Sequence, residues 1–283
     1  SRPPGEISFA LNQHVFFGKP MYPYLYALGA ILCWASLPAA TGSALDGLST
    51  EALLFYSFGS GAVFLYLLDV VRQRSWRLSW PDGKTMVLGV WGIFIYHWVY
   101  YLALDRAPIA EAAILATTWS FWMVVFSSLQ RFKKITFSIA ATALICMAGA
   151  GLVISAGKTV AFEGCYLLGY GLALGCGLIW SSFSVGLALI KPKEEPMTAF
   201  MVMAALLSSV VYVLTGPHPA PAPGALAAAL YLGCVPLGLS FFLWNRALLN
   251  GKKALIGNKS VITTPQAVQF VGQSRREAIS PQV

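Results

Sequence analysis

Eight long apolar runs, separated by short loops, dominate this sequence. Each run reaches the roughly 17–25 residues that an α-helix needs to cross a bilayer, and a helix in lipid satisfies its own backbone hydrogen bonds. The runs are apolar on nearly all sides, which excludes a soluble amphipathic bundle. The sequence therefore predicts an all-α integral membrane protein, a polytopic bundle of antiparallel helices. The runs lie at about residues 22–44, 50–71, 85–104, 107–130, 135–155, 163–190, 198–215 and 224–249.

Composition narrows the partners of the chain. Charged residues make up 11% of it, against roughly 25% in soluble domains, and the mean hydropathy is +0.68. The basic residues behind the net charge of +8 lie in the gaps between apolar runs, not on one face. We therefore expect the lipid bilayer as partner and no nucleic acid. The five cysteines fall in or beside apolar runs and are expected to be buried, reduced thiols.

The loops predict an orientation. If the N-terminus is cytoplasmic, fifteen of the nineteen Lys and Arg residues lie on the cytoplasmic side of the membrane and four lie on the opposite side. A bias of this size favours a cytoplasmic N-terminus. Residues 1–21 are mixed in character and lack an initiator Met, so we treat them as an N-terminal extension. The four basic residues on the outside are Arg106, Lys158, Arg275 and Arg276.

An internal repeat divides the chain. Residues 24–36 read YLYALGAILCWAS and residues 170–182 read YGLALGCGLIWSS, with seven of thirteen positions identical at a shift of 146. Five helices separate the two copies, so the second copy enters the membrane from the opposite side. Inverted repeats are typical of secondary transporters, which bind solutes where the two halves meet. We predict two inverted five-helix repeats, at residues 22–155 and 163–283.

The run 85–104 carries the first candidate solute-binding residues. Tyr96 and Tyr100 share one helix face at a spacing of four, and His97 and Tyr101 form an adjoining pair. An ionisable group such as His97 is costly inside a span unless it faces water or a partner. These residues predict one wall of a central cavity. Two alternatives stay open: an interfacial aromatic belt for Tyr100 and Tyr101, and a satisfied structural role for His97.

Four further residues complete the predicted cavity. Trp119 lies in mid-span among polar residues, although tryptophan prefers the membrane interface; cavity lining and plain packing both explain it. Trp34 and Trp180 are equivalent in the repeat, which suits a site near its twofold axis. Asn245 lies in the equivalent zone of the run 224–249.

Other kinds of chemistry lack a signal in the sequence. All eleven carboxylates lie outside the middle of a span, with Asp69 and Glu111 near span ends. This favours a facilitator or an exchanger, or else His97 as the titrating group. No phosphate-binding loop, metal cluster or activated nucleophile is evident, so we expect neither enzymatic activity nor a cofactor. Phosphorylated solutes would require mid-span Lys or Arg, and the predicted spans lack them.

On these features the chain resembles the drug/metabolite transporter superfamily, EamA type. The resemblance rests on the two predicted halves, the Gly-x-x-x-x-Trp-Ser-like motif that opens each, and the Ala-Leu ending of the third and eighth runs. Tyr96-His97, Tyr100, Trp119 and Trp180 make it similar to bacterial aromatic amino acid exporters within that superfamily. The resemblance implies a ten-helix basket in the bacterial inner membrane, with both termini cytoplasmic and a central cavity. It implies export of aromatic and related neutral amino acids by alternating access, and we expect a monomer.

The C-terminal part departs from the family pattern. Residues 266–276 are too polar and too short for a good span, and the sequence stops before a tenth helix. We expect eight secure spans, a compromised ninth and a missing tenth. The cargo also stays open, because lipophilic cations, drugs or other metabolites could use the same scaffold. A membrane-embedded enzyme or a scaffold protein would need a constellation of residues that the sequence lacks.

Overall fold

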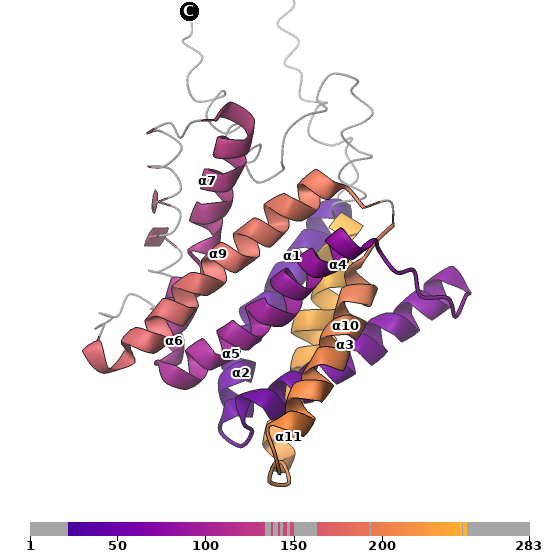
Figure 1. Cartoon of the computed structure of the whole chain (residues 1–283), viewed down its shortest axis with the longest axis vertical. Coiled ribbons are helices and arrows are strands. Elements are labelled where there is room, and N and C mark those ends of the chain that lie inside the picture. Colours follow the sequence, from indigo (N-terminus) through magenta and orange to yellow (C-terminus); the bar gives the residue numbers. More distant parts are fainter. Residues whose placement is uncertain are drawn as a thin grey trace, which may run out of the picture.

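The computed structural model consists of helices, with no strand in the part of the chain that it describes (Figure 1). The described residues are 22–133, 163–192, 194–244 and 246–247, with a few single positions between 137 and 149. Within them, seven helical stretches are long and apolar enough to cross a membrane. They are Tyr22–Leu45, Thr50–Gln73, Gly83–Arg106, Ile109–Gln130, Gly164–Ile190, Met197–Leu214 and Pro223–Trp244.

Each of these stretches coincides with one predicted apolar run, so the polytopic all-α membrane fold is confirmed. The predicted run 135–155 falls outside the described residues apart from the single positions. The expected ninth helix and the question of a tenth lie outside them entirely.

The first stretch is a broken helix and the second a continuous one. α1 (Tyr22–Ala35) and α2 (Leu37–Leu45) are separated at Ser36, and α2 has a proline in its first turn. A proline there costs no helical hydrogen bond, because the first backbone N–H groups have no partner in any case. α3 (Thr50–Gln73) runs unbroken from its N-cap Ser49, whose hydroxyl accepts a hydrogen bond from the backbone N–H of Ala52 at 3.3 Å.

The fourth stretch is also broken. α6 (Ile109–Ala116) and α7 (Trp119–Phe132) are separated at Thr117 and Thr118. A long helix, α9 (Leu167–Ile190), follows the short 3-10 turn η3 (Gly164–Tyr166) and lies against this break. The approach is close because a Cβ on Gly177 would overlap the hydroxyl of Thr118.

Two stretches contain a π-helical segment. In Gly83–Arg106, η2 (Val90–Ile95) separates α4 (Gly83–Gly89) from α5 (Tyr96–Arg106). In Pro223–Trp244, η4 (Gly233–Leu239) follows α11 (Pro223–Leu232). The repeat shift of 146 carries residues 90–95 onto 236–241, so the two segments overlap in the repeat register. The inverted repeat itself stays a prediction.

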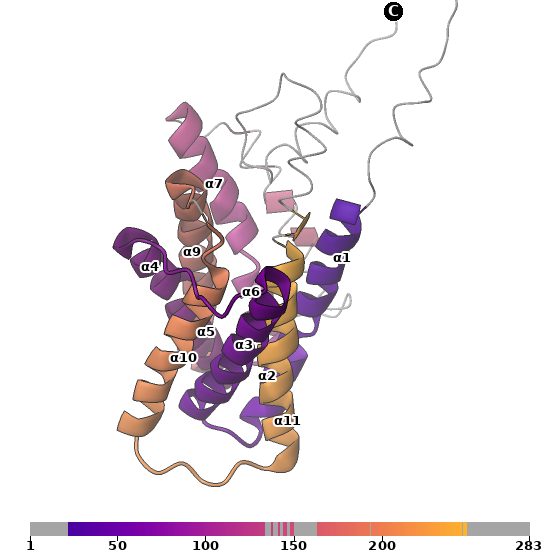
Figure 2. The ribbon, with the colours of Figure 1, turned by 90° about the vertical axis from the view of Figure 1, so that its right-hand side faces the viewer.

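Helices of the first predicted half pack mostly on helices of the second. α3 lies along α10 (Met197–Leu214) and η4, while α10 also contacts η2. α9 packs on α5, α6 and α7, and α11 packs on α2 (Figure 2). The pattern is reciprocal, because the π-helical segment of each half contacts a helix of the other half. The fully buried core includes Phe58 of α3 and Phe200 of α10.

The cysteines depart in part from expectation. Cys33, Cys165, Cys176 and Cys234 are free thiols, as predicted. Cys176 is buried in α9 and Cys33 and Cys234 are half-buried, whereas Cys165 in the turn before α9 is exposed, so the expectation of burial is wrong for Cys165. Its position at the end of the apolar run explains the difference, because burial there depends on whether a neighbouring helix extends as far.

Candidate functional site

A row of aromatic rings links helices from both halves. Trp34 on α1 contacts Phe241, with ring centroids 6.2 Å apart, and Phe241 stacks on Trp180 of α9 at 6.2 Å. Trp180 contacts Tyr96 of α5 at 5.1 Å, and Tyr96 stacks on Tyr100 at 6.0 Å. We call these five residues the aromatic row. It brings Trp34 and Trp180, equivalent in the repeat, to the same phenylalanine ring.

The π-helical segments position the row. Tyr96 is the first residue after η2, and Phe241 is the second after η4. π-helical turns are rare and often occur at functional sites. Glycine lets the second half approach: a Cβ on Gly92 in η2 would overlap the side chain of Phe183 on α9. The ring of Phe183 in turn lies 5.5 Å from that of Trp180.

His97 makes the contacts of a well-packed structural histidine. Its Nδ1 lies 2.7 Å from the backbone carbonyl of Ile93 in η2, to which it donates a hydrogen bond. Its ring meets those of Phe58, Tyr96 and Tyr101 edge-on, at 5.5, 4.9 and 6.1 Å. The side chain is buried, so in this conformation His97 packs against Tyr96 of the row.

Tyr101 and Trp119 occupy different surroundings. Tyr101 is fully buried, and its hydroxyl lies 3.2 Å from that of Ser57 on α3, so it does not extend into an interfacial belt. Trp119 is half-buried at the start of α7, and its carbonyl accepts a hydrogen bond from Ser181 at 2.6 Å. Trp119 thus adjoins the row through the neighbour of Trp180. Asn245 lies outside the described residues.

Sequence reasoning missed Phe241 and Phe183. A phenylalanine inside an apolar run is indistinguishable from an ordinary core residue, and the shift of 146 places Ile95 opposite Phe241. One signal was present in the repeat itself, because Trp98 and Trp244 coincide at the same shift. Trp244 contacts Trp34 at 5.3 Å and so extends the row at its α1 end.

The chemistry of the row suits flat or cationic groups, and three of its rings are buried in this conformation: Tyr96, Tyr100 and Phe241 are 9%, 3% and 3% exposed. Its five side chains carry no charge, and its polar atoms are tyrosine hydroxyls and tryptophan N–H groups. Aromatic faces attract other rings by offset or edge-on stacking, and they attract ammonium groups through the ring quadrupole. These are the two features of an aromatic amino acid that an uncharged site can recognise directly.

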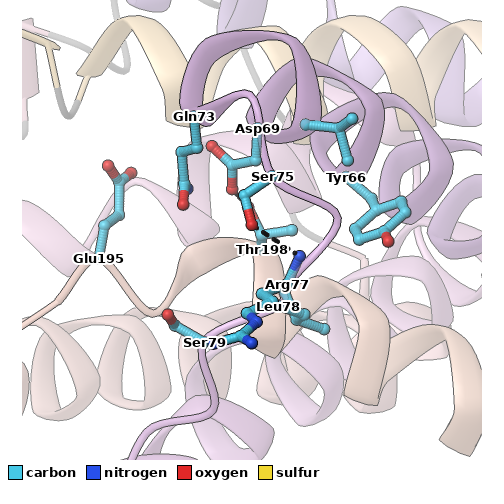
Figure 3. Close-up of a pocket in the computed structure, with 10 residues that line it drawn as sticks. Tyr66, Asp69, Gln73, Ser75, Arg77, Leu78, Ser79, Glu195 and Thr198 are labelled. Atoms are coloured by element: carbon cyan, nitrogen blue, oxygen red, sulfur yellow. Dashed lines mark hydrogen bonds between the residues drawn. The ribbon is translucent and has the colours of Figure 1, made fainter.

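A small polar pocket of about 20 Å³ lies at the C-terminal end of α3 (Figure 3). Figure 3 shows Asp69, Ser75 and Thr198 gathered around it, with Glu195 on the neighbouring segment. The hydroxyl of Thr198 donates to Asp69 at 2.5 Å. The sequence analysis did not single out this pocket. It is lined by Tyr66, Asp69, Val70, Gln73, Ser75, Arg77, Leu78, Ser79, Glu195 and Thr198.

Comparison with known proteins gives the family context. Residues 21–155 match the EamA-like transporter family. The chain is 31% identical over 237 residues to the aromatic amino acid exporter YddG of Ancylobacter novellus, covering 82% of each protein. It is 29% identical over 132 residues to the pseudopaline exporter CntI of Pseudomonas aeruginosa, covering 46% of this chain and 45% of that one. A solved structure titled "Crystal structure of protein" superposes with a TM-score of 0.64 at 25% identity, covering 85% of this chain and 89% of the other.

Proposed function

Because the chain belongs to the EamA-like transporter family, we propose that it is a secondary transporter that exports aromatic and related neutral amino acids by alternating access. The observation that carries the proposal is the aromatic row, to which both halves contribute. A solute bound there touches both halves at once. Any relative movement of the halves then changes the binding site, as alternating access requires.

The chemistry of the row supports the choice of cargo. Stacking on Trp180 and Tyr96 recognises an aromatic side chain, and the same faces attract the ammonium group. The similarity to an aromatic amino acid exporter over 82% of each chain supports the same cargo. We include Tyr101, Trp119, His97 and Asn245 in the proposed site as supporting residues of its wall.

The membrane setting follows from the family and from the loops. The protein is a multi-pass membrane protein with bacterial transporter relatives, which places it in the inner membrane. We propose that its N-terminus is cytoplasmic, because that orientation puts most Lys and Arg residues inside. We further propose that it works as a monomer, since a single chain contributes every member of the aromatic row.

Lipophilic cations are the second candidate cargo. The faces of Trp34, Trp180 and Tyr96 would attract a delocalised cation through the ring quadrupole. The row has no carboxylate that would distinguish a cation from a neutral zwitterion. The two cargoes must therefore be compared in one assay.

The test is transport by the purified full chain in liposomes. We expect the wild type to move phenylalanine and tryptophan faster than empty vesicles, and faster than alanine or tetraphenylphosphonium. Trp180→Ala should slow aromatic transport roughly tenfold, because it removes a stacking partner and its buried area. The matched control is Trp80→Ala, since Trp80 is 52% exposed in the loop before α4.

The outcomes separate the alternatives. Transport of tetraphenylphosphonium but not of phenylalanine would replace the amino acid with a cation as cargo. Equal rates for wild type, Trp180→Ala and Trp80→Ala would show that the aromatic row does not bind the solute. Trp180→Phe keeps a ring in place, so its partial activity would distinguish lost recognition from lost folding.

A further inference from the structure

α3 and α10 form an antiparallel pair that is fastened at both ends by polar side chains. At the C-terminal end of α3, Thr198 of α10 donates to Asp69 at 2.5 Å. Arg72 lies 3.8 Å from Asp69 and 3.8 Å from Glu195, which stands just before α10. We call these four residues the basic-end latch, since Arg74 and Arg77 follow in the adjoining loop.

A histidine holds the other end of the same pair. Nε2 of His218, in the loop after α10, donates to the carbonyl of Tyr212 at 2.9 Å. Its Nδ1 lies 3.3 Å from the hydroxyl of Ser49, the N-cap residue of α3. The imidazole also stacks on Tyr212, with ring centroids 4.0 Å apart, and Tyr212 stacks on Phe55 at 4.6 Å. We call Ser49, Tyr212 and His218 the histidine latch.

The two latches occupy equivalent places in the repeat. A shift of 146 carries Arg72 onto His218, and the same shift carries Ser49 onto Glu195. The Arg72–Glu195 pair at one end therefore corresponds to the His218–Ser49 pair at the other. Tyr66 likewise falls on Tyr212.

Tyr66 and Tyr212 each hold the loop that follows their helix. The hydroxyl of Tyr66 donates to the carbonyl of Trp76 at 2.8 Å and so holds the loop after α3. Tyr212 holds the loop after α10 through His218. Equivalent positions thus fasten equivalent loops at opposite ends of the pair.

A close backbone contact near the middle of α3 provides a pivot between the latches. A Cβ on Gly61 would meet the carbonyl oxygen of Gly233 at 2.9 Å, and a Cβ on Gly233 would overlap backbone and side-chain atoms of Ser57 and Ser60. Small residues let helix backbones approach closely, and here they join α3 to η4. The same Cβ on Gly61 would lie 3.4 Å from Sδ of Met201 on α10, so the contact lies beside the α3–α10 interface. Each latch lies about half a helix length from this point.

We propose that these latches are the two gates of the transport cycle, which open alternately as α3 tilts relative to α10 about its Gly61–Gly233 contact with η4. In an inverted repeat, exchanging the conformations of the halves exchanges the two ends of the molecule. A contact that closes one end must then have an equivalent at the other, as these two clusters do. The proposal rests on the transport function proposed above and adds the residues that control access to the site.

The two latches differ in chemistry, and this difference determines which end of the molecule is closed more of the time. The basic-end latch contains a charge-assisted hydrogen bond and two ion pairs, whereas the histidine latch joins a hydroxyl, an imidazole and a carbonyl. The Arg72 and Glu195 side chains are 35% and 31% exposed, so their ion pair shifts an equilibrium by a factor of only roughly two to five. Such a contact can break in each cycle and still bias the resting protein towards closure at the basic end.

The test measures spin-label distances in the full chain in liposomes, without added solute. One label pair replaces Gln73 and Glu194 at the basic end, and a second pair replaces Asp46 and Pro219 at the histidine end. The native cysteines are changed to serine in this background. Glu195→Gln should raise the long-distance population at the basic end roughly two- to fivefold and lower it at the histidine end.

A second variant reverses the prediction. His218→Phe keeps the ring on Tyr212 but removes the hydrogen bond to Ser49, so it should widen the histidine end and narrow the basic end. The control is Asp105→Asn, which removes an exposed ion pair with Arg106 of 3.4 Å that does not join α3 to α10. It should leave both distributions unchanged.

Two results would overturn the proposal. One is a single narrow distance at both ends in every variant, which would make the α3–α10 pair a static support. The other is widening of both ends together, which would indicate general loosening. If the distances at the two ends change in opposite directions but the protein does not transport aromatic amino acids, the latches act as gates and only the proposed cargo is wrong.

Discussion

α1 and α5 have similar aromatic side chains and opposite surroundings. α1 reads YPYLYALGAILCWA, and α5 reads YHWVYYLALDR. Tyr22 and Tyr24 of α1 are 66% and 61% exposed, whereas Tyr100 and Tyr101 of α5 are 3% and 0% exposed. Tyrosine content therefore does not mark the inner wall of a transporter. The neighbouring helices decide it.

The difference arises from how each helix is enclosed. α5 packs against α9, α3 and α2, which help to bury six of its eleven residues. α1 contacts η4 and α2 along one side, and Trp34 is its link to the aromatic row. The stability of a tyrosine in α5 therefore depends on the protein side chains around it. A tyrosine on the outer face of α1 depends instead on lipid and headgroups.

The largest expected contrast is in stability. Tyr101→Ala should lower the free energy of unfolding by about 3–5 kcal/mol, because it empties a fully buried site, whereas Tyr24→Ala should cost less than about 0.5 kcal/mol. Denaturation of both variants in the same detergent measures the difference. If the two variants lose similar stability, the contrast between the helices is not one of burial.

A smaller contrast is expected at two glycines. Gly92→Ala should destabilise the protein by about 1–3 kcal/mol, because the added methyl group overlaps Phe183 close to its backbone. At Gly29 of α1 a Cβ would meet only the flexible end of Leu243, at 3.1 Å, so Gly29→Ala should be neutral or slightly stabilising. Apparent melting temperatures decide between these outcomes, and a melting temperature for Gly92→Ala equal to that of the wild type would contradict the tight packing of η2 on α9.

The smallest effect concerns pH at the start of the span that contains α5. Asp82, the N-cap residue of α4, accepts a hydrogen bond from Thr85 at 2.5 Å, and this bond lowers the pKa of the Asp82 carboxyl. A lowered pKa in the folded state stabilises the protein above the ordinary value of about 3.9 and loses that contribution as the pH falls through the folded pKa. We expect a slight drop in melting temperature at acid pH that Asp82→Asn lacks. The described residues of α1 include no carboxylate, so variants there should leave the drop intact.

Hydropathy predicted the seven described spans because the bilayer fixes their length and composition. It did not predict the breaks at Ser36 and at Thr117–Thr118, nor the segments Val90–Ile95 and Gly233–Leu239. Hydropathy averaged over a segment reflects its composition and contains no information on which carbonyl accepts a hydrogen bond from which N–H. Proline explains the first break and accompanies η4, but η2 contains none.

The candidate site was partly predictable. The repeat identified Trp34 and Trp180, and helix spacing paired Tyr96 with Tyr100; the structure brings these four into one row. Their role in binding remains a prediction. His218 was not predictable as a contact between helices because it lies in a loop outside the apolar runs. Only the partner across the bundle, Ser49, makes it conspicuous.

The π-helical segment Val90–Ile95 has a consequence for sequence change. Each of its turns holds one residue more than an α-helical turn, so removing a single residue there could restore regular α-helix without breaking the span. The wide turn absorbs the extra residue, so such a deletion would leave Tyr96 and Tyr100 pointing in nearly their present direction relative to α4. If the same residues instead tightened into regular α-helix with none removed, everything beyond them would rotate by about 100° about the helix axis. A substitution that abolished the wide turn would therefore leave a membrane helix that hydropathy cannot distinguish from the original, with its aromatic face turned away from Trp180.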